Sequence, residues 1–273
     1  MIRPICVALG LAILGSPPGR AENQLPPILR EVGIDQRLNE QVPLDLPFRN
    51  ETGNTVRLGD YFNGKPVILV MAYYRCPQLC TQVINGLLFG LQGVAFDAGD
   101  EFQVVVVSFD ERETPELAAA KKASYVHAYG RPHGETGWHF LTGQQASIDA
   151  LTGAVGFRYR YDPKRDQFAH GSGIMLLTPQ GKISRYFYGI KFSPTDLRLG
   201  LVDASENRMG SPIDRFNLWF CYEYDPSVGQ YTVHVLNLVR LGGAVTVVIL
   251  ATALYIAFRR ERRKAHQVMT TTG

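Results

Sequence analysis

Two cysteines with three residues between them are the part of this chain best suited to chemistry. Cys76 and Cys80, two of four cysteines, lie where an apolar run ends and a helix-like pattern begins. Residues i and i+4 of a helix share a face, and a helix N-terminus favours the thiolate by lowering the pKa of a thiol. Two thiolates select copper(I) or zinc over hard cations. A redox dithiol and a plain disulfide also fit this spacing, so all three interpretations remain open.

A third ligand for a metal site has to come from elsewhere in the chain. Of the six histidines, His170 is the best candidate, because it lies in the loop that enters an expected C-terminal hairpin. In a thioredoxin-like fold, that loop abuts the N-terminus of the first helix. An imidazole there completes a Cys2His set suited to copper or zinc. The alternative is a solvent-facing polar histidine, and spacing alone does not separate the two.

The remaining sulfur-containing residues have plainer interpretations. Met71 and Met175 fall in apolar runs and are expected in the core. Cys221 lies in an aromatic stretch, where it either packs as a small apolar residue or adds a third thiol. Cys6 precedes an apolar stretch near the N-terminus and is expected to leave with a signal segment.

The elements around the cysteines predict a parallel sheet. Residues 66–73 form a short apolar run rich in β-formers, and residues 102–109 form a second with consecutive valines at its centre. Between them, residues 78–96 carry apolar side chains at helical spacing. Two buried strands joined by a helix predict a right-handed βαβ unit, with the cysteines at the end of its first strand.

The elements that follow continue in the order of thioredoxin. Thr114 and Pro115 begin a helix as its N-cap and first residue, and this helix runs to about Tyr129. The sequence therefore predicts an α/β, thioredoxin-like fold, in which helices flank a central mixed sheet. The other expected elements are a strand at 138–141, a helix at 144–154, hairpin strands at 173–177 and 183–188, and a helix at 194–207.

The two ends of the chain predict its location. Residues 1–21 have an early arginine, an apolar stretch and a small-x-small cleavage site, typical of an export signal; an uncleaved anchor is the alternative. Residues 241–258 carry no charge and are long enough to form a transmembrane helix. Five basic residues follow within 259–264 and mark that side as cytoplasmic. We expect a single-pass inner-membrane protein with a periplasmic domain and a cytoplasmic C-terminus.

The net charge argues against one class of partner. The chain carries +3 in total, but residues 259–264 hold +4 and Arg3 and Arg20 add +2, so the body between them is near −3. A slightly acidic body gives no electrostatic footprint for nucleic acid. The expected divisions are a signal peptide (1–21), an extended Pro-rich arm (22–43), a thioredoxin-like domain (44–208), an aromatic-rich juxtamembrane extension (209–238), a transmembrane helix (239–258) and a basic tail (259–273).

Several motifs in order resemble the Sco/SenC family of copper proteins. Residues 76–80 match its Cys-Pro-x-x-Cys motif, and residues 108–115, Ser-Phe-Asp-Glu-Arg-Glu-Thr-Pro, resemble its S-x-D-P-x-x-D-T-P element. Residues 138–143 resemble its W-x-x-L-T-G, and residues 177–181 resemble its D-P-x-G hairpin. His170 falls where the family has its ligand histidine. The resemblance covers about residues 44–208.

The resemblance implies a site, a cofactor and partners. It makes Cys76, Cys80 and His170 the ligands of copper, as Cu(I) or Cu(II), and makes Asp110 an acid close to the ligands or facing a partner, with plain surface charge as the alternative. It implies cytochrome c oxidase subunit II or a related copper oxidase as client, and other periplasmic copper chaperones or thiol reductants as further partners. Three features depart from the family: Thr81 stands where Pro is frequent, the membrane anchor is C-terminal, and the C-terminal extension that contains residues 216–226 lies outside the common pattern.

Two functions fit these residues. The first, which we favour, is a metallochaperone that delivers copper to the binuclear copper centre of subunit II and needs all three ligands. The second is a periplasmic thiol-disulfide oxidoreductase that keeps the client's copper-ligand cysteines reduced and needs only Cys76 and Cys80. His170 discriminates between them, because dithiol chemistry has no need of an imidazole. A peroxide-reducing relative fits less well, since nothing near Cys76 supplies the usual threonine and arginine, although Arg75 is adjacent.

Overall fold

A five-stranded mixed sheet forms the centre of the protein. The computed structural model describes residues 31–76, 79–205, 222–225, 229–233 and 235–271. Strands β4 (Val67–Ala72), β5 (Gln103–Ser108) and β6 (Trp138–Leu141) run parallel, and β9 (Gly173–Leu177) and β10 (Ile183–Tyr188) complete the order β10-β9-β4-β5-β6. β9 pairs antiparallel with both β4 and β10. Every side chain of β4, β5 and β9 is buried, which explains the continuous apolar runs that predicted them.

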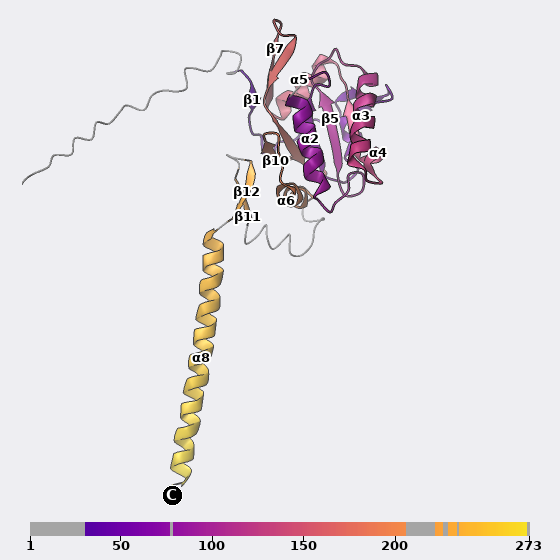
Figure 1. Cartoon of the computed structure of the whole chain (residues 1–273). Coiled ribbons are helices and arrows are strands. Elements are labelled where there is room, and N and C mark those ends of the chain that lie inside the picture. Colours follow the sequence, from indigo (N-terminus) through magenta and orange to yellow (C-terminus); the bar gives the residue numbers. More distant parts are fainter. Residues whose placement is uncertain (1–30, 77–78, 206–221, 226–228, 234, 272–273) are drawn as a thin grey trace, which may run out of the picture.

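Helices pack against the central sheet. Figure 1 shows α2 (Leu79–Gln92) and α3 (Pro115–Tyr129) close to each other across β5, and α2 also contacts α6 (Pro194–Ala204). α3 has Thr114 as N-cap and ends at Gly130, whose φ of 67° is the left-handed conformation that glycine favours. The other helical segments are η2 (Leu58–Tyr61), α4 (Gly134–Gly137) and α5 (Gln145–Ala154).

Three small β-units lie outside the central sheet. One is a three-stranded antiparallel sheet of order β1-β7-β8, made of β1 (Gly33–Ile34), β7 (Phe157–Asp162) and β8 (Gln167–His170). The others are the hairpins β2–β3 (Pro47–Arg49 and Thr55–Arg57) and β11–β12 (Tyr222–Asp225 and Gln230–Val233). The sequence did not predict any of these strands.

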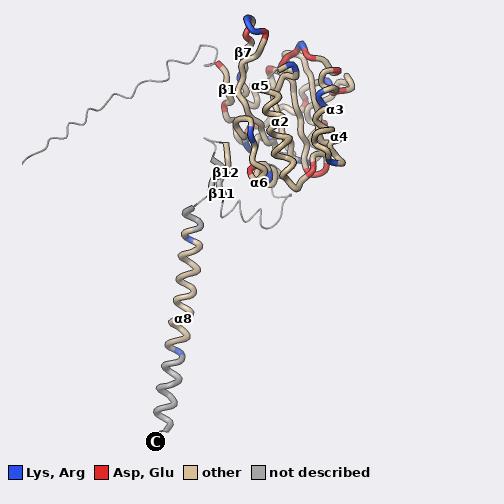
Figure 2. The backbone as a smooth tube through the Cα atoms, in the orientation of Figure 1, with Lys and Arg blue, Asp and Glu red and all other residues tan. Residues whose placement is uncertain are grey.

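A long helix follows the globular part of the chain. Helix α8 covers Val235–Thr271, and within it Val239–Ala257 has a mean hydropathy of 1.9 with none of the window buried. Figure 2 shows that this stretch has almost no acidic or basic residues. It is the one helix among the described residues that is long and apolar enough to cross a membrane. The described helix continues to Thr271, through most of the expected basic tail, whereas residues 1–30 and 206–221 lie outside the described part of the chain.

The α/β, thioredoxin-like architecture that the sequence predicted is confirmed. The βαβ unit β4-α2-β5 is present with parallel strands, and the terminal hairpin β9–β10 follows it in the expected order. Predicted and observed bounds of the central strands agree to within one or two residues.

Candidate metal centre

The two cysteines lie between the end of β4 and the first turn of α2. The described part of α2 begins at Leu79 and includes Cys80, whereas Cys76 lies before residues 77–78, which are outside the described part of the chain. The two residues are nevertheless in contact, because the Cys80 N–H donates to Cys76 Sγ over 3.3 Å. Both side chains are buried, and both are free thiols.

His170 reaches the cysteines from a different sheet. Its Nε2 lies 3.0 Å from Cys80 Sγ, and the possible ligand atoms of Cys76, Cys80 and His170 all lie within 4.8 Å of one another. His170 is the last residue of β8, opposite Tyr159 of β7, and not part of a loop as expected. The structure thus brings together the three residues that the sequence nominated as ligands.

The tautomer of His170 suits a metal ligand. Its Nδ1 lies 2.6 Å from the carbonyl oxygen of Gly171, which can only accept a hydrogen bond. The proton is therefore assigned to Nδ1, and Nε2 keeps its lone pair toward the cysteines. A backbone carbonyl that orients a ligating imidazole in this way is a common feature of metal sites.

Aromatic rings surround the imidazole. The ring centroids of Tyr73, Phe109 and Phe157 lie 6.1, 5.3 and 6.0 Å from that of His170. The backbone N–H of Tyr73 also donates to Cys80 Sγ over 3.5 Å. This packing limits the rotamers open to His170 and keeps the environment of the cysteines apolar.

Burial changes the acidity of Cys80. Desolvation, followed by the hydrogen bond with Cys76, raises the pKa of the Cys80 thiol well above its ordinary value. The expectation that the helix N-terminus would lower the pKa is therefore not met at Cys80, because burial outweighs the helix dipole. Without a metal, Cys80 is a neutral thiol at neutral pH, so metal binding there must release its proton.

A buried carboxylate fixes the backbone just ahead of Cys76. Glu113 accepts hydrogen bonds from the N–H groups of Tyr74 and Arg75, each over 2.7 Å, and from the Ser108 hydroxyl over 2.6 Å. Burial raises the pKa of Glu113, and these three donors act in the opposite direction. The sequence prediction missed this residue. The available signal was an acidic side chain next to the helix start at Thr114, within the element that resembles the family.

Asp110 lies at the end of β5, and its carboxylate is paired with Arg112. Asp110 is almost fully buried, and its two oxygens accept from Nε and Nη2 of Arg112 over 2.7 and 2.8 Å. Arg112 in turn lies 5.5 Å from the ring of Phe168, two residues before His170. A role of Asp110 next to the metal ligands stays a prediction, and its observed connection to His170 runs through Arg112.

The remaining residues that the sequence singled out do not join the three candidate ligands in the described part of the chain. Thr81, which departs from the family's Pro, uses its hydroxyl to donate to the carbonyl oxygen of Cys76 over 3.3 Å. Met71 and Met175 are buried in β4 and β9, as expected of core residues. Cys6 and Cys221 lie outside the described residues.

The strand that pairs with the His170 strand has a sequence pattern that the prediction missed. Phe157, Tyr159 and Tyr161 alternate with charged residues in Phe-Arg-Tyr-Arg-Tyr-Asp, the period-2 pattern of a half-buried strand. The segment Asp162–Asp166 contains Pro163 and provides a turn, after which the chain returns as β8. This pattern predicts a hairpin that ends at His170.

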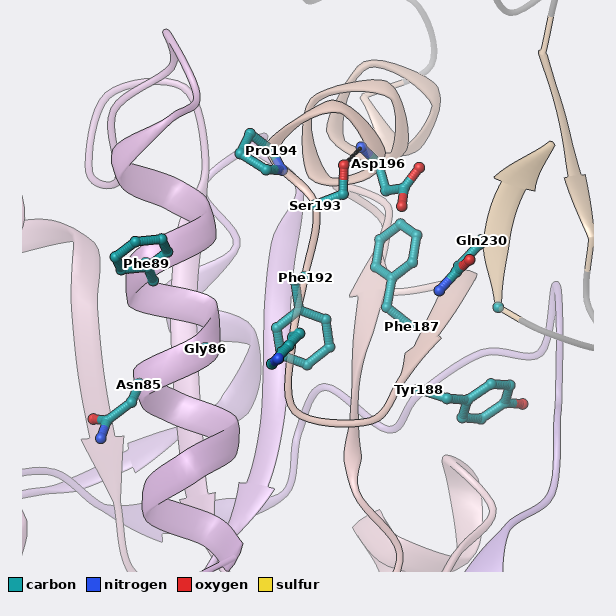
Figure 3. A pocket seen from close by; sticks show the side chains of 12 residues that line it. Asn85, Gly86, Phe89, Phe187, Tyr188, Phe192, Ser193, Pro194, Asp196 and Gln230 are labelled. Carbon is teal, nitrogen blue, oxygen red and sulfur yellow. Dashed lines mark hydrogen bonds between the residues drawn. The ribbon is translucent and has the colours of Figure 1, made fainter. Parts of the chain in front are cut away.

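A pocket of about 760 Å³ lies away from the three candidate ligands. Its walls come from α2, the end of β10, the start of α6 and the β12 end of the β11–β12 hairpin (Figure 3). Gly86 of α2 lies so close to this region that a Cβ there would be 2.0 Å from the Ile190 carbonyl oxygen. None of Cys76, Cys80 and His170 lines the pocket, so the metal centre is a separate feature.

Comparisons with known proteins match the chain to one family and to solved structures of similar fold. The SCO1/SenC family model matches residues 35–198. Two structures from Aquifex aeolicus VF5, a putative electron transfer protein and a putative electron transport protein, are each 24% identical to the chain. The first match covers 63% of this chain and 96% of the other with a TM-score of 0.56, and the second covers 62% and 98% with a TM-score of 0.52.

A third solved structure is more distant, and the curated proteins give no match. Arabidopsis thaliana ScoI, solved with copper bound, is 20% identical over 59% of this chain and 96% of its own, with a TM-score of 0.47. No curated protein matched the chain.

The fold and the site together define a class of protein: a thioredoxin-like domain in which two cysteines and a histidine could hold a metal ion. The family match covers more than half of the chain, and the chain belongs to the SCO1/SenC family. The two Aquifex structures show the same fold.

Proposed function

We propose that this protein is a copper-binding assembly factor, a metallochaperone that delivers copper to the binuclear copper centre of cytochrome c oxidase subunit II. The observation that carries the proposal is the approach of His170 Nε2 to 3.0 Å from Cys80 Sγ, with Cys76 Sγ in the same cluster. Two sulfurs and an imidazole suit both oxidation states of copper. Membership of the SCO1/SenC family supports copper as the metal.

The protein's own residues have distinct tasks in this proposal. Cys76, Cys80 and His170 bind the copper cargo, and the Gly171 carbonyl keeps the imidazole in the ligating tautomer. The rings of Tyr73, Phe109 and Phe157 pack around the imidazole and help to hold it in place. Delivery proceeds by exchange of Cys76 and Cys80 for thiolates of the client, so no turnover of a substrate bond is required.

The location proposed for this function is the inner membrane, with the thioredoxin-like domain in the periplasm. Helix α8 supplies a span that could cross the bilayer. The basic residues at 259–264 favour a cytoplasmic position for that end. The divisions given above, including the cleaved signal at 1–21 and the domain at 44–208, belong to the same proposal.

A thiol-disulfide oxidoreductase is the second candidate function. Cys76 and Cys80 are in contact with each other, as the two thiols of a dithiol that reduces a client disulfide need to be. That chemistry gives no reason for an imidazole to approach Cys80 in its ligating tautomer. The raised pKa of Cys80 also makes this thiol a poor nucleophile at neutral pH.

Copper titration of the reduced full chain in detergent, without oxygen, tests the binding step. The wild-type chain should bind one copper(I) in competition with a chelator. His170→Ala should weaken binding at least about tenfold, since even residues that only orient ligands are worth about 10–100-fold. Cys76→Ser/Cys80→Ser should abolish binding. His127→Ala changes an exposed histidine on α3 and should bind like the wild type.

A transfer assay tests the delivery step. The copper-loaded full chain is mixed with the copper-free, reduced copper domain of subunit II, and the copper bound to each protein is measured after separation. Appearance of copper in subunit II supports the proposal. If copper binding is indifferent to His170 while the dithiol reduces a disulfide of subunit II equally well in His170→Ala, the oxidoreductase function replaces it.

A further inference from the structure

The hairpin that carries His170 belongs to a different sheet from β4, the strand that precedes the cysteines. Strands β7 and β8 belong to the small sheet β1-β7-β8, which shares no ladder with the central sheet in the described part of the chain. β8 continues into β9 through Gly171 and Ser172; the Ser172 carbonyl accepts from the Gly189 N–H over 2.9 Å, and β9 begins at Gly173. Because the two sheets share no ladder among the described residues, side-chain contacts between them position the rest of the hairpin, beyond this short connection.

One side chain, Arg112, connects the end of the central sheet to the tip of the β7–β8 hairpin. Nη1 of Arg112 donates to Asp166 Oδ1 over 3.0 Å, and Asp166 lies in the turn between β7 and β8. The Tyr161 hydroxyl donates to the same oxygen over 2.7 Å. These two hydrogen bonds hold the pKa of Asp166 below its ordinary value. Figure 2 marks acidic and basic residues at this tip, next to β7.

The same guanidinium contacts both strands of the hairpin. Its central carbon lies 5.1 Å from the ring centroid of Tyr161 in β7 and 5.5 Å from that of Phe168 in β8. Phe168 in turn packs against Tyr73 and Phe109, the rings that also contact His170. Arg112 thus contacts the hairpin at its turn and near its ligand end.

The other end of the bridge is anchored in the core. Asp110 binds Arg112 through both carboxylate oxygens, and its side chain is only 3% exposed. Its own N–H donates to the Ser108 hydroxyl over 3.1 Å, at the end of the central strand β5. A buried carboxylate requires such a partner, so the guanidinium is held in one orientation.

We propose that Arg112 is a positioning residue: anchored by Asp110, it holds the β7–β8 hairpin through Asp166, Tyr161 and Phe168 and so keeps His170 over Cys76 and Cys80. The proposal rests on the proposed function for its effect on copper, but its effect on the hairpin does not. The residue touches no candidate ligand, so it acts on copper only through the position of the imidazole.

Two variants test the bridge without leaving the buried Asp110 carboxylate unpaired. Asp166→Asn alters only the hairpin side, at a side chain that is 75% exposed. Arg112→Lys keeps a positive charge beside Asp110 but lacks the planar guanidinium group that binds Asp110 and Asp166 at the same time. Arg165→Gln is the matched control, because Arg165 lies in the same turn, is 79% exposed and approaches only Asp162, at 3.9 Å.

The first measurement is amide hydrogen exchange of the metal-free full chain in detergent. In Asp166→Asn and Arg112→Lys, the amides of β7 and β8 should exchange at least about threefold faster than in the wild type, because local opening of the hairpin becomes easier. Amides of β4 and β5 and the whole Arg165→Gln chain should be unchanged. Unchanged exchange of β7 and β8 in both variants would overturn the proposal.

The second measurement is a double-mutant cycle on copper(I) affinity. Either variant should lose about tenfold in affinity, at the lower end of what residues that orient metal ligands contribute. In a His170→Ala background the same change should cost nothing further, because the residue through which Arg112 acts is gone. An equal loss in both backgrounds would show that Arg112 does not act through His170. If the wild-type chain binds no copper, the proposed function fails, and hydrogen exchange alone decides on the bridge.

Discussion

At the scale of single residues, the site is held by buried and half-buried polar groups that have defined partners. His170 is oriented by the Gly171 carbonyl, and Cys80 receives the N–H of Tyr73. Glu113 collects three donors, two of which come from the residues just before Cys76. Such satisfied networks make a site rigid, and removal of one member leaves a buried group without its partner.

Glu113→Gln should therefore destabilise the protein. The amide has one acceptor oxygen in place of two, so its NH2 group must face one of the donors from Tyr74, Arg75 or Ser108. We expect a loss of about 1–3 kcal/mol in the free energy of unfolding. Denaturant unfolding of the full chain in detergent measures it, with the exposed Glu111→Gln as control. Equal stability of the two variants would show that these hydrogen bonds contribute little.

At the scale of elements, two sheets meet at the metal centre. The sequence predicted the central sheet but not the small sheet β1-β7-β8. The fully buried strands β4, β5 and β9 show continuous apolar runs, which any reader of the sequence can recognise. The small sheet β1-β7-β8 has exposed positions and many charged residues, so its hydrophobic pattern is weaker. Residues 157–162 nevertheless show the alternation typical of a half-buried strand. His170 was consequently nominated correctly as a residue but expected in a loop.

The edge strand β6 carries a pH-sensitive element of stability. His139 packs against Tyr61, lies 3.0 Å from Gln103 Oε1 through Nε2, and burial lowers its pKa from 6.5 to about 4. A histidine with a depressed folded-state pKa contributes stability above its unfolded pKa, and this is lost as the pH falls from about 6.5 toward 4.

The loss attributable to His139 is on the order of 2 kcal/mol between pH 7 and pH 5. Unfolding of the full chain in detergent at both pH values measures it. His139→Gln should reduce this pH dependence by that amount, whereas His127→Gln, at an exposed position, should leave it intact. A His139→Gln chain that keeps the full dependence would contradict the assignment.

At the scale of the whole molecule, a thioredoxin-like domain and an apolar helix are parts of one chain. The apolar stretch Val239–Ala257 and the basic cluster after it could be predicted from composition alone, since length and charge decide such segments. The position of Arg112 between two sheets could not, because it depends on how segments far apart in sequence pack. The same limit hid Glu113, because its two backbone donors, Tyr74 and Arg75, precede it by almost forty residues.

The membrane assignment predicts how the full chain behaves in cells. Extraction of membranes with alkaline carbonate should leave the chain in the pellet, since a span of this length is held by its apolar side chains. Reagents that reach only the periplasm should label the domain but not a cysteine placed at Thr271 in the tail. Release by carbonate, or labelling of the tail from the periplasm, would contradict the proposed topology.

The central claim is that Cys76, Cys80 and His170 together bind copper, and X-ray absorption of the copper(I)-loaded full chain tests it most directly. The account predicts two sulfur neighbours and one imidazole nitrogen around the metal, with the nitrogen lost in His170→Ala and both sulfurs retained. The exposed His127→Ala should leave the spectrum unchanged. A wild-type spectrum without an imidazole, or one whose nitrogen persists in His170→Ala, would contradict the account.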